Sequence, residues 1–334
     1  MPRAVDGDQR GHDLVTFGET MIRLSASGGK RLEEATTLDL AIGGTEANVA
    51  VALARLGLRV AWLSALPDNT LGRRVDAELR RHGVDTTHVI WSDRDRAGVY
   101  FLDPGVPPRP TRVLYDRVDS AVSRVDPDAI NYAIVERAGA LHLTGVTPAL
   151  SPGCAAVCHR LAGAAARAGI PIVLDVNYRA RLWPPDAAAA GLAPLLDRAT
   201  LLLCGASDAA TIWGLAGAPE EVARALLDRS AAESVVVTLA ADGALAMTRA
   251  GDITLQRAVP VTVVDPVGAG DAFAAGFLSR WLGNRDGMAA ALQAGVALAA
   301  LKLTMPGDLA IITPAELAET MALAGSPPAP DIDR

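Results

Sequence analysis

Short apolar runs and longer amphipathic stretches alternate along most of the chain. Runs rich in Val, Leu and Ile, bounded by turn residues, predict buried strands over residues 14–18, 60–66, 140–143, 172–175, 201–204 and 234–238. Between these runs apolar residues recur with a helical period, which predicts helices over residues 45–57, 71–82, 127–138, 151–168, 187–197 and 219–229. Strands that alternate with helices indicate an α/β fold, in which helices flank a doubly wound, mostly parallel sheet.

Two stretches depart from this alternation. Short β-like pieces at 98–102 and 112–115 flank a Pro-rich turn, and together with residues 21–42 they predict a small β-sheet lid. Further on, a hairpin-like stretch over 244–263 precedes two apolar helices over 269–282 and 287–303. The expected organisation is a main domain over 13–324, its lid formed by about 21–42 and 88–118, a disordered tail over 1–12 and a C-terminal tail over 325–334.

Composition narrows the class of protein. Of the 334 residues, 50% are hydrophobic and 21% are charged, which is typical of a chain that folds around a sizeable core. The net charge of −7 argues against a nucleic-acid partner, because such proteins usually carry a basic balance or stripe. No apolar run approaches the roughly 20 residues that a membrane-spanning helix needs, so we expect no membrane partner.

The three cysteines, Cys154, Cys158 and Cys204, show no spacing that indicates a metal site or a disulfide framework. We therefore expect them to be buried free thiols. Their odd number and the lack of a secretory leader are typical of a protein of the reducing cytoplasm.

The segment 264–273 (Val-Asp-Pro-Val-Gly-Ala-Gly-Asp-Ala-Phe) carries the clearest chemical pattern. Its small residues let the backbone approach a ligand closely, and free N–H groups at a helix start favour an anion such as a phosphate. Asp271 falls in the first turn of the predicted helix, beside that anion site. Complementarity to the helix dipole could also explain a carboxylate there. The Gly-x-Gly-Asp spacing after Asp-Pro favours a catalytic role instead.

Two other phosphate-binding patterns are missing from the sequence. It contains no Gly-x4-Gly-Lys-Ser/Thr loop, and residues 268–270 lack the third glycine of a dinucleotide fingerprint. A nicotinamide dehydrogenase on a similar sheet is therefore disfavoured.

The segment 264–273 resembles the C-terminal signature of the ribokinase-like (PfkB) carbohydrate kinases, and the stretch Gly43-Gly44-Thr45-Glu46-Ala47-Asn48 resembles their other signature. The resemblance runs from about Asp13 to Thr320. Within the family, several strings resemble 2-keto-3-deoxygluconate kinases, namely Gly18-Glu19 with Arg23-Leu24, 43–48, 98–100, 115–117 followed by 120–121, 144–151, 175–179 and 306–308.

This resemblance implies a ribokinase-like fold with a β lid. It also implies an enzyme that uses ATP and Mg²⁺ to phosphorylate a sugar-acid hydroxyl, converting 2-keto-3-deoxygluconate to its 6-phosphate. A homodimer formed through the lid is expected as well, since an open sheet edge invites pairing. Whether a monovalent cation is required stays open.

Roles come from the same resemblance, residue by residue. Asp271 would take the proton from the attacking hydroxyl, and the backbone N–H groups from Val267 through Gly268, Ala269 and Gly270 would stabilise the charge on the transferred group. The implied substrate-binding residues are Gly43, Gly44, Asn48, Tyr100, Tyr115, Arg117, Arg179 and Asp271. The implied nucleotide-binding residues are Asn177, Arg179, Thr238, Ala240, Gly243, Gly268 and Gly270.

Arg117 is the candidate for the substrate carboxylate, because a guanidinium pairs bidentately with that group. A surface salt bridge to Asp116 or Asp119 is the competing interpretation.

Two positions depart from the family pattern. Relatives often carry Asn-x-x-Glu where this chain has Gly205-Ala206-Ser207-Asp208, so Asp208 could contact Mg²⁺ only through water. Ala240 replaces a glycine of the nucleotide loop, and it would be strained if that position needs a positive φ.

Three functions stay in competition at this point. The first is the sugar-acid kinase, and the second is a kinase for another substrate (fructose, 5-dehydro-2-deoxygluconate, ribose or a nucleoside). The third is a non-catalytic sugar or nucleotide sensor, which the changes at Gly205, Asp208 and Ala240 motivate and the intact Asp271 disfavours.

Overall fold

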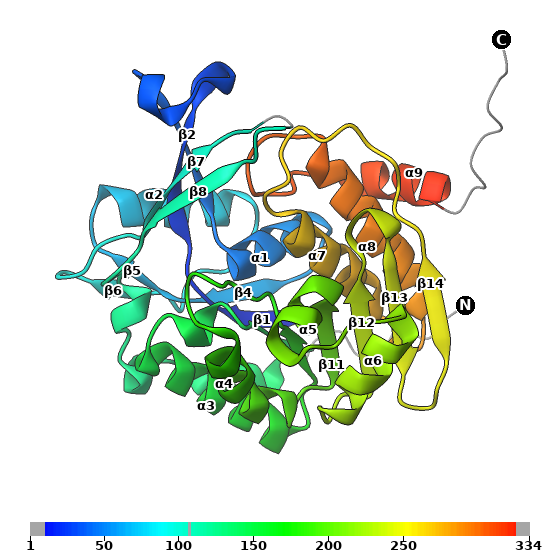
Figure 1. Cartoon of the computed structure of the whole chain (residues 1–334). Helices are drawn as coiled ribbons and strands as arrows, with labels where there is room; N and C mark the ends of the chain where they lie inside the picture. Colours follow the sequence, from blue (N-terminus) through cyan, green and yellow to red (C-terminus); the bar gives the residue numbers. More distant parts are fainter. Residues whose placement is uncertain (1–10, 106–107, 325–334) are drawn as a thin grey trace, which may run out of the picture.

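The computed structural model describes residues 11–105 and 108–324. Within them, an eight-stranded sheet in the order β14-β13-β12-β11-β10-β9-β1-β4 crosses the centre of the molecule (Figure 1). Its strands are β1 (Leu14–Phe17), β4 (Val60–Leu63), β9 (Leu141–Thr144), β10 (Ile172–Asp175), β11 (Leu201–Gly205), β12 (Ser234–Thr238), β13 (Ala244–Thr248) and β14 (Ile253–Gln256). Neighbours from β4 to β12 pair in parallel, whereas β13 and β14 run antiparallel at one edge. The predicted mostly parallel sheet is confirmed.

Helices cover both faces of this sheet (Figure 1). One face, with its own cluster of buried apolar side chains, carries α3 (Pro152–Ala168), α4 (Pro185–Leu196), α5 (Ala206–Trp213) and α6 (Pro219–Asp228). The other face, with a second cluster, carries α1 (Thr45–Arg55), α2 (Thr70–Arg81), α7 (Ala269–Trp281), α8 (Met288–Leu303) and α9 (Pro314–Ala324). Because successive strand residues point to opposite faces, Leu202 joins the first cluster and Leu203 the second.

A separate four-stranded sheet projects from the main domain at the upper left of Figure 1. Its order is β3-β2-β7-β8, with β2 (Met21–Ala26), β3 (Leu38–Gly43), β7 (Val99–Asp103) and β8 (Arg112–Asp116). Apart from Gly43 at the end of β3, these strands lie within residues 21–42 and 88–118, the segments expected to form the lid. The register places Arg23 opposite Tyr100 and Tyr100 opposite Tyr115, so these side chains share one face.

Capping residues set the ends of α3. The Ser151 hydroxyl accepts a hydrogen bond from the Cys154 N–H at 3.1 Å, and Pro152 occupies the first helical position. Gly169 ends the helix with φ 68°, the left-handed conformation that glycine tolerates best.

Close packing of α7 against α8 fixes the region that carries the predicted motif. A Cβ on Gly276 of α7 would stand 2.4 Å from the Ala294 carbonyl oxygen of α8, so only glycine permits this approach. As a result, residues 265–271 at the start of α7 lie beside residues 302–308 at the end of α8.

Several predicted boundaries are wrong. Residues 127–138 form two short 3₁₀ helices, Pro127–Ala129 and Tyr132–Arg137, because the buried Ile130 between them has extended backbone (φ −77°, ψ 135°). The predicted strand 60–66 is divided between β4 and β5 (Ala65–Pro67), and β5 pairs with β6 (Ile90–Ser92) outside both larger sheets. The sequence prediction also omits α5 and α9.

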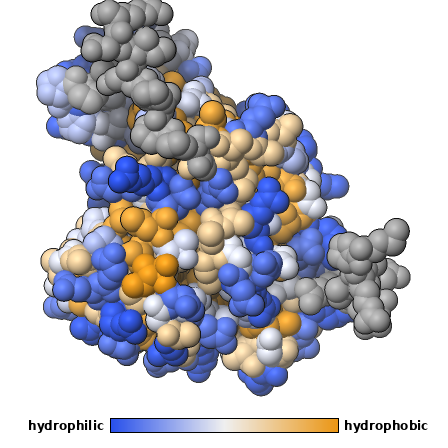
Figure 2. Space-filling view, turned by 90° about the vertical axis from the view of Figure 1, so that its right-hand side faces the viewer, coloured by the Kyte–Doolittle hydropathy of each residue, from blue (hydrophilic) through white to orange (hydrophobic). Residues whose placement is uncertain are grey.

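The edge of the sheet is less covered than its centre. Figure 2 views the side of β14 and α9, where apolar patches lie among hydrophilic side chains. On β14, Ile253 and Leu255 are 49% and 57% exposed. The parallel centre of the sheet is buried on both faces, in contrast to β14.

The predicted tails lie mostly outside the described residues, which leave out 1–10 and 325–334. Gly11 and His12 belong to the domain, since the Gly11 N–H donates to the Arg137 carbonyl and His12 Nε2 lies 2.8 Å from Asp85 Oδ2. The three cysteines are free and buried, as predicted. None of the described helices is long and apolar enough to cross a membrane.

Candidate active site

A cavity of about 460 Å³ opens at the carboxyl ends of β10, β11 and β12, where the start of α7 and the lid meet them. Ligands of open α/β sheets bind at such strand ends. The predicted site residues that line it are Gly43, Gly44, Asn48, Tyr100, Tyr115, Arg117, Asn177, Arg179, Asp208, Thr238, Gly268, Ala269, Gly270 and Asp271. Ala240 and Gly243 do not line it. The fold thus brings together segments more than 200 residues apart, such as Asn48 and Asp271.

Asp271 lies in the first turn of α7 and is 6% exposed. Its Oδ2 accepts a hydrogen bond from Asn48 Nδ2 at 2.6 Å, and its Oδ1 lies 3.4 Å from Asn177 Nδ2. Burial raises the pKa of Asp271 to about 6, although the Asn48 hydrogen bond and the Arg179 charge oppose the rise. A carboxylate with this pKa is ionised at neutral pH and still basic enough to accept a proton.

Asn48, predicted to bind the substrate, lines the cavity and also holds two parts of the site together. Its Oδ1 accepts from the Gly44 N–H at 3.3 Å while its Nδ2 donates to Asp271. The amide therefore joins the start of α1 to the carboxylate of α7. At Gly44, a Cβ would stand 2.0 Å from the Glu19 carbonyl oxygen, so the backbone of Glu19 fills the space that the missing side chain leaves.

The loop before α7 offers backbone donors to the cavity. Gly268 has φ +85°, and a Cβ there would meet the Asp308 carbonyl oxygen at 2.2 Å. A Cβ on Gly270 would meet nothing within 4 Å. The N–H groups of Gly268 and Gly270 have no acceptor in the part of the chain that the structure describes. The Val267 N–H, which was expected to stabilise the transferred group, donates to Asp265 Oδ1 at 3.0 Å.

Two more carboxylates face the same cavity, Asp175 at the end of β10 and Asp208 in the first turn of α5. Burial and the charge of Asp271 raise the pKa of Asp175 to about 7, and burial raises that of Asp208. Neither forms an ion pair within residues 11–105 and 108–324. Asn177 Nδ2 donates to Asp175 Oδ2 at 3.2 Å and to Asp271 Oδ1 at 3.4 Å. Asn177 has φ +39°, and its buried Oδ1 has no partner among the described residues.

These groups fit a hydrated cation better than a fully coordinated one. Among the described residues, no group of three or more His, Cys, Asp or Glu side chains is placed to hold a metal directly. Mg²⁺ keeps several of its waters and takes only one or two carboxylates in sites that also hold phosphates. Asp175, Asp208 and the unsatisfied Asn177 Oδ1 supply acceptors of the right chemistry for such waters.

Only part of the predicted nucleotide loop lines the cavity. Thr238 ends β12 at the cavity wall, whereas Ala240 lies in the following 3₁₀ turn with φ +52°. Ala240 therefore has the backbone strain that was expected if this position needed a positive φ. Arg179, which lines the cavity, donates to the Tyr178 carbonyl and has no carboxylate partner in the described part of the chain.

Arg117 pairs with neither residue of the competing interpretation, since Asp116 pairs with Arg96 and Asp119 with Arg124. Instead, both Nε and Nη2 of Arg117 donate to Glu19 Oε2, the first at 2.7 Å. Glu19 Oε1 is buried without a partner among the described residues, and both side chains line the cavity. The Arg117 guanidinium also lies 5.5 Å from the centre of the Tyr115 ring.

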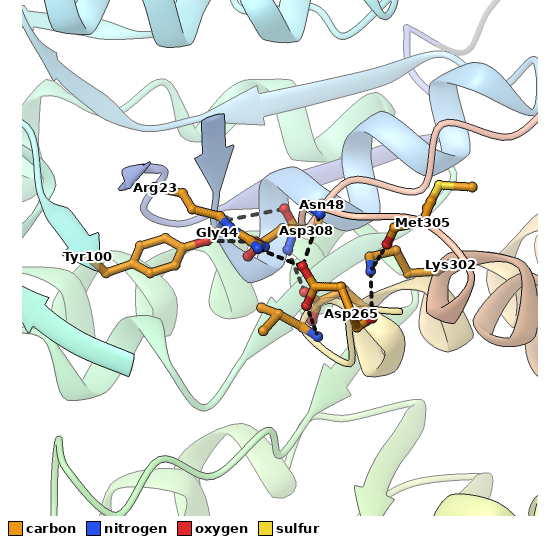
Figure 3. Close-up of polar contacts among 11 residues, drawn as sticks. Arg23, Gly44, Asn48, Tyr100, Asp265, Lys302, Met305 and Asp308 are labelled. Atoms are coloured by element: carbon orange, nitrogen blue, oxygen red, sulfur yellow. Dashed lines mark hydrogen bonds and ion pairs between the residues drawn. The ribbon is translucent and has the colours of Figure 1, made fainter. Parts of the chain in front are cut away.

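A buried network joins the lid to the loop before α7 (Figure 3). Arg23 of β2 donates to Asp265 Oδ2 and to Asp308 Oδ1, both at 2.6 Å. The Tyr100 hydroxyl donates to Asp308 Oδ1 at 2.7 Å, so it is already engaged, although its ring lines the cavity. Asp265 also accepts from the Gly307 N–H. Every carboxylate of this network has a cationic partner.

Sequence reasoning did not assign roles to Glu19, Arg23, Asp175, Asp308 or the buried Glu46. Glu46 Oε1 accepts from the hydroxyls of Thr144 and Thr147 at 2.7 and 2.6 Å, and burial raises its pKa to about 7. All five lie in strings that resemble sugar-acid kinases. The likeness of these strings to the family was the signal in the sequence that could have identified the five residues.

Comparisons with known proteins found relatives that match most of the chain. The profile of the pfkB family carbohydrate kinases matches residues 12–315. The chain is 44% identical over 305 residues to a 2-dehydro-3-deoxygalactonokinase of Haloferax volcanii, covering 91% of this chain and 95% of the relative. The crystal structure of a Thermotoga maritima 2-dehydro-3-deoxygluconokinase superposes with a TM-score of 0.87 at 29% identity, covering 92% and 99% of the two chains. A provisionally named Ribokinase II from E. coli, solved with ATP and Mg²⁺, shares the fold with a TM-score of 0.85 at 19% identity over 93% and 99%.

Proposed function

The chain belongs to the PfkB family of carbohydrate kinases, and on that premise we propose that it phosphorylates a 2-keto-3-deoxy sugar acid with ATP. The favoured reaction converts 2-keto-3-deoxygluconate to its 6-phosphate. One observation supports this most directly. The buried carboxylate of Asp271 lies in one cavity with the unused N–H groups of Gly268 and Gly270.

In this proposal Asp271 accepts the proton of the substrate hydroxyl as its oxygen attacks the phosphoryl group. Base catalysis by a positioned carboxylate contributes typically about 10²–10⁴-fold. Asn48 keeps the carboxylate aimed at the cavity through its 2.6 Å hydrogen bond. The N–H groups of Gly268 and Gly270 donate to the phosphoryl oxygens while negative charge develops on them.

An acid substrate suits the lid side of the cavity. Arg117 directs one edge of its guanidinium at Glu19, which leaves donors for a substrate carboxylate on the other edge. The rings of Tyr100 and Tyr115, whose centres lie 5.9 Å apart, form the apolar wall beside it. The names of both sugar-acid kinases above specify 2-dehydro-3-deoxy acids, and the two names differ in the epimer.

Nucleotide phosphates would lie at Gly268, Gly270, Asn177 and Arg179. Mg²⁺ would be held through water by Asp175 and Asp208, and it would neutralise phosphate charge. A homodimer through the lid remains part of the proposal. The outer face of that sheet carries Leu40 and Leu114, which are 39% and 53% exposed. A cytoplasmic location stays a prediction.

ADP release with Mg-ATP tests the function against a panel of acceptors. The panel contains 2-keto-3-deoxygluconate, its galactose epimer, gluconate, fructose, ribose and 5-dehydro-2-deoxygluconate. We expect selective turnover of one or both keto-deoxy acids. Turnover of a neutral sugar alone would refute the acid substrate, and a folded protein that binds ATP without turning over any acceptor would favour the sensor.

A further inference from the structure

Lys302 is a fully buried cation that the proposed reaction does not use. It lies in the last turn of α8, and its side chain is 0% exposed. No carboxylate lies within ion-pairing distance of it in the part of the chain that the structure describes. Burying an ammonium group that has no compensating partner costs much free energy, so the surroundings of Lys302 must supply a negative electrostatic potential.

Backbone carbonyl groups supply that potential. Lys302 Nζ donates to the Asp265 carbonyl at 3.1 Å and to the Met305 carbonyl at 3.3 Å (Figure 3). The ammonium also lies at the C-terminus of α8, where the helix dipole is negative. Burial lowers the pKa of Lys302, and the nearby charges of Asp265 and Asp308 oppose this change. An ammonium between carbonyl oxygens has the surroundings that proteins give to small monovalent cations.

The two carbonyls belong to the two segments that enclose the start of α7. Asp265 begins the loop that leads to Gly268, and its backbone and side chain are held by Leu303, Gly307 and Arg23. Met305 begins the turn that leads to Asp308, whose carbonyl oxygen packs against Gly268. The ammonium of Lys302 therefore ties together the two sides of the loop that presents the phosphate-binding N–H groups.

We propose that Lys302 is a built-in monovalent cation that positions the loop 265–271, so that turnover needs no added K⁺ or NH₄⁺. The proposal rests on the proposed function, because turnover is its first readout. It makes Lys302 a positioning residue, since its ammonium contacts the loop and no reacting atom.

Two substitutions separate the charge from the space it fills. Lys302→Ala removes both and leaves room between the carbonyls, whereas Lys302→Met fills the space without a charge. Turnover is measured in chloride salts of K⁺, NH₄⁺ and N-methylglucamine at equal ionic strength. Arg249→Ala is the control, because Arg249 also donates to backbone carbonyls, those of Leu227, Ser230 and Ala232, but away from the cavity.

The wild type should turn over equally well in all three salts. Lys302→Ala should lose about 10²-fold in kcat in N-methylglucamine, the loss typical of a small misplacement of reacting groups, with KM for the sugar acid nearly unchanged. K⁺ or NH₄⁺ should restore at least a tenth of the wild-type rate to Lys302→Ala, but not to Lys302→Met. Arg249→Ala should keep its kcat in every salt.

A wild type that depends on K⁺, a Lys302→Met variant with normal kcat, or a folded Lys302→Ala variant that no cation rescues would each overturn the proposal. Melting temperatures in the same salts provide a readout without catalysis. K⁺ should raise the melting temperature of Lys302→Ala and leave that of the wild type and of Lys302→Met unchanged; equal shifts in all three would contradict the proposal. If the wild type phosphorylates no acceptor, the proposed function fails while this thermal test still decides the role of Lys302.

Discussion

Two groups of carboxylates near the start of α7 differ in whether they have a cationic partner. Asp265 and Asp308 lie on the lid side, and both pair with Arg23 at 2.6 Å. Asp175, Asp208 and Asp271 line the strand ends, and none of them has a cationic partner within the described residues. Burial raises the pKa values of this second group, and it also raises that of Asp308, so the cationic partner is what distinguishes the groups. The paired group is complete without a ligand, whereas the unpaired group is arranged for a proton and for cations that arrive with the substrates.

Breaking the paired group should have the largest effect on stability. Arg23→Met leaves two carboxylates buried without their cation, which we expect to lower the free energy of unfolding by about 3–5 kcal/mol. Urea denaturation measures this change. The matched control is Arg96→Met, which removes a pair with Asp116 whose side chains are 43% and 57% exposed and should cost less than about 1 kcal/mol. Equal losses in the two variants would remove the distinction between the regions.

Arg117 tests whether the lid side recognises an acid. Arg117→Met should lower kcat/KM for the sugar acid by about 10–100-fold, the value of a charged hydrogen bond of roughly 1.5–3 kcal/mol. The loss for fructose, which has no carboxylate, should be several-fold smaller in the same assay. Arg117→Lys should recover part of the loss, because it restores the charge without the planar fork. If kcat/KM fell by the same factor for the sugar acid and for fructose, Arg117 would only hold Glu19 in place and would not bind the substrate carboxylate.

The pH dependence of turnover tests whether Asp271, in the unpaired group, is the base. With the pKa of Asp271 at about 6, kcat/KM should be constant above that pH and fall tenfold per pH unit below it, as the base becomes protonated. The Asn48 hydrogen bond lowers this pKa, so Asn48→Ala should move the midpoint to higher pH. Asn69→Ala, which removes only the cap of α2, should leave the midpoint in place. An unchanged midpoint in Asn48→Ala would argue against Asp271 as the titrating base.

The smallest effect is expected at the nucleotide loop. Ala240 has φ +52°, so Ala240→Gly should relieve strain and raise the free energy of unfolding by about 0.5–1 kcal/mol after the larger chain entropy of glycine is subtracted. Its neighbour Ala241 has no positive φ, and Ala241→Gly should be neutral or destabilising in the same urea titration. A loss of stability in Ala240→Gly would show that the turn accepts alanine without strain.

The two regions also differ in how far the sequence predicts them. Asp271, Gly268 and Gly270 lie within one short motif, so the local pattern already indicates their joint role. Arg23 pairs with residues 242 and 285 positions away, and no local periodicity carries that information. Its two partners become neighbours only because α7 packs closely against α8.

Secondary structure shows the same limit at short range. The strands from β9 to β12 are clear in the sequence because they are apolar and buried on both faces. Residues 127–138 have helical periodicity, yet burial of Ile130 in an extended conformation divides them into two short helices. In this segment, tertiary packing overrides the local preference for one continuous helix.

The comparison of Asp271→Asn with the wild type tests the central claim most directly, with kcat and urea unfolding measured on the same samples. The account predicts a kcat lower by about 10²–10⁴-fold, the range for a lost general base, with retained binding of ATP and sugar acid. It also predicts an unfolding free energy at pH 8 equal to or above that of the wild type, because a neutral amide replaces a buried charge. Turnover close to that of the wild type, or a loss of turnover that only follows a loss of folding, would contradict Asp271 as the base.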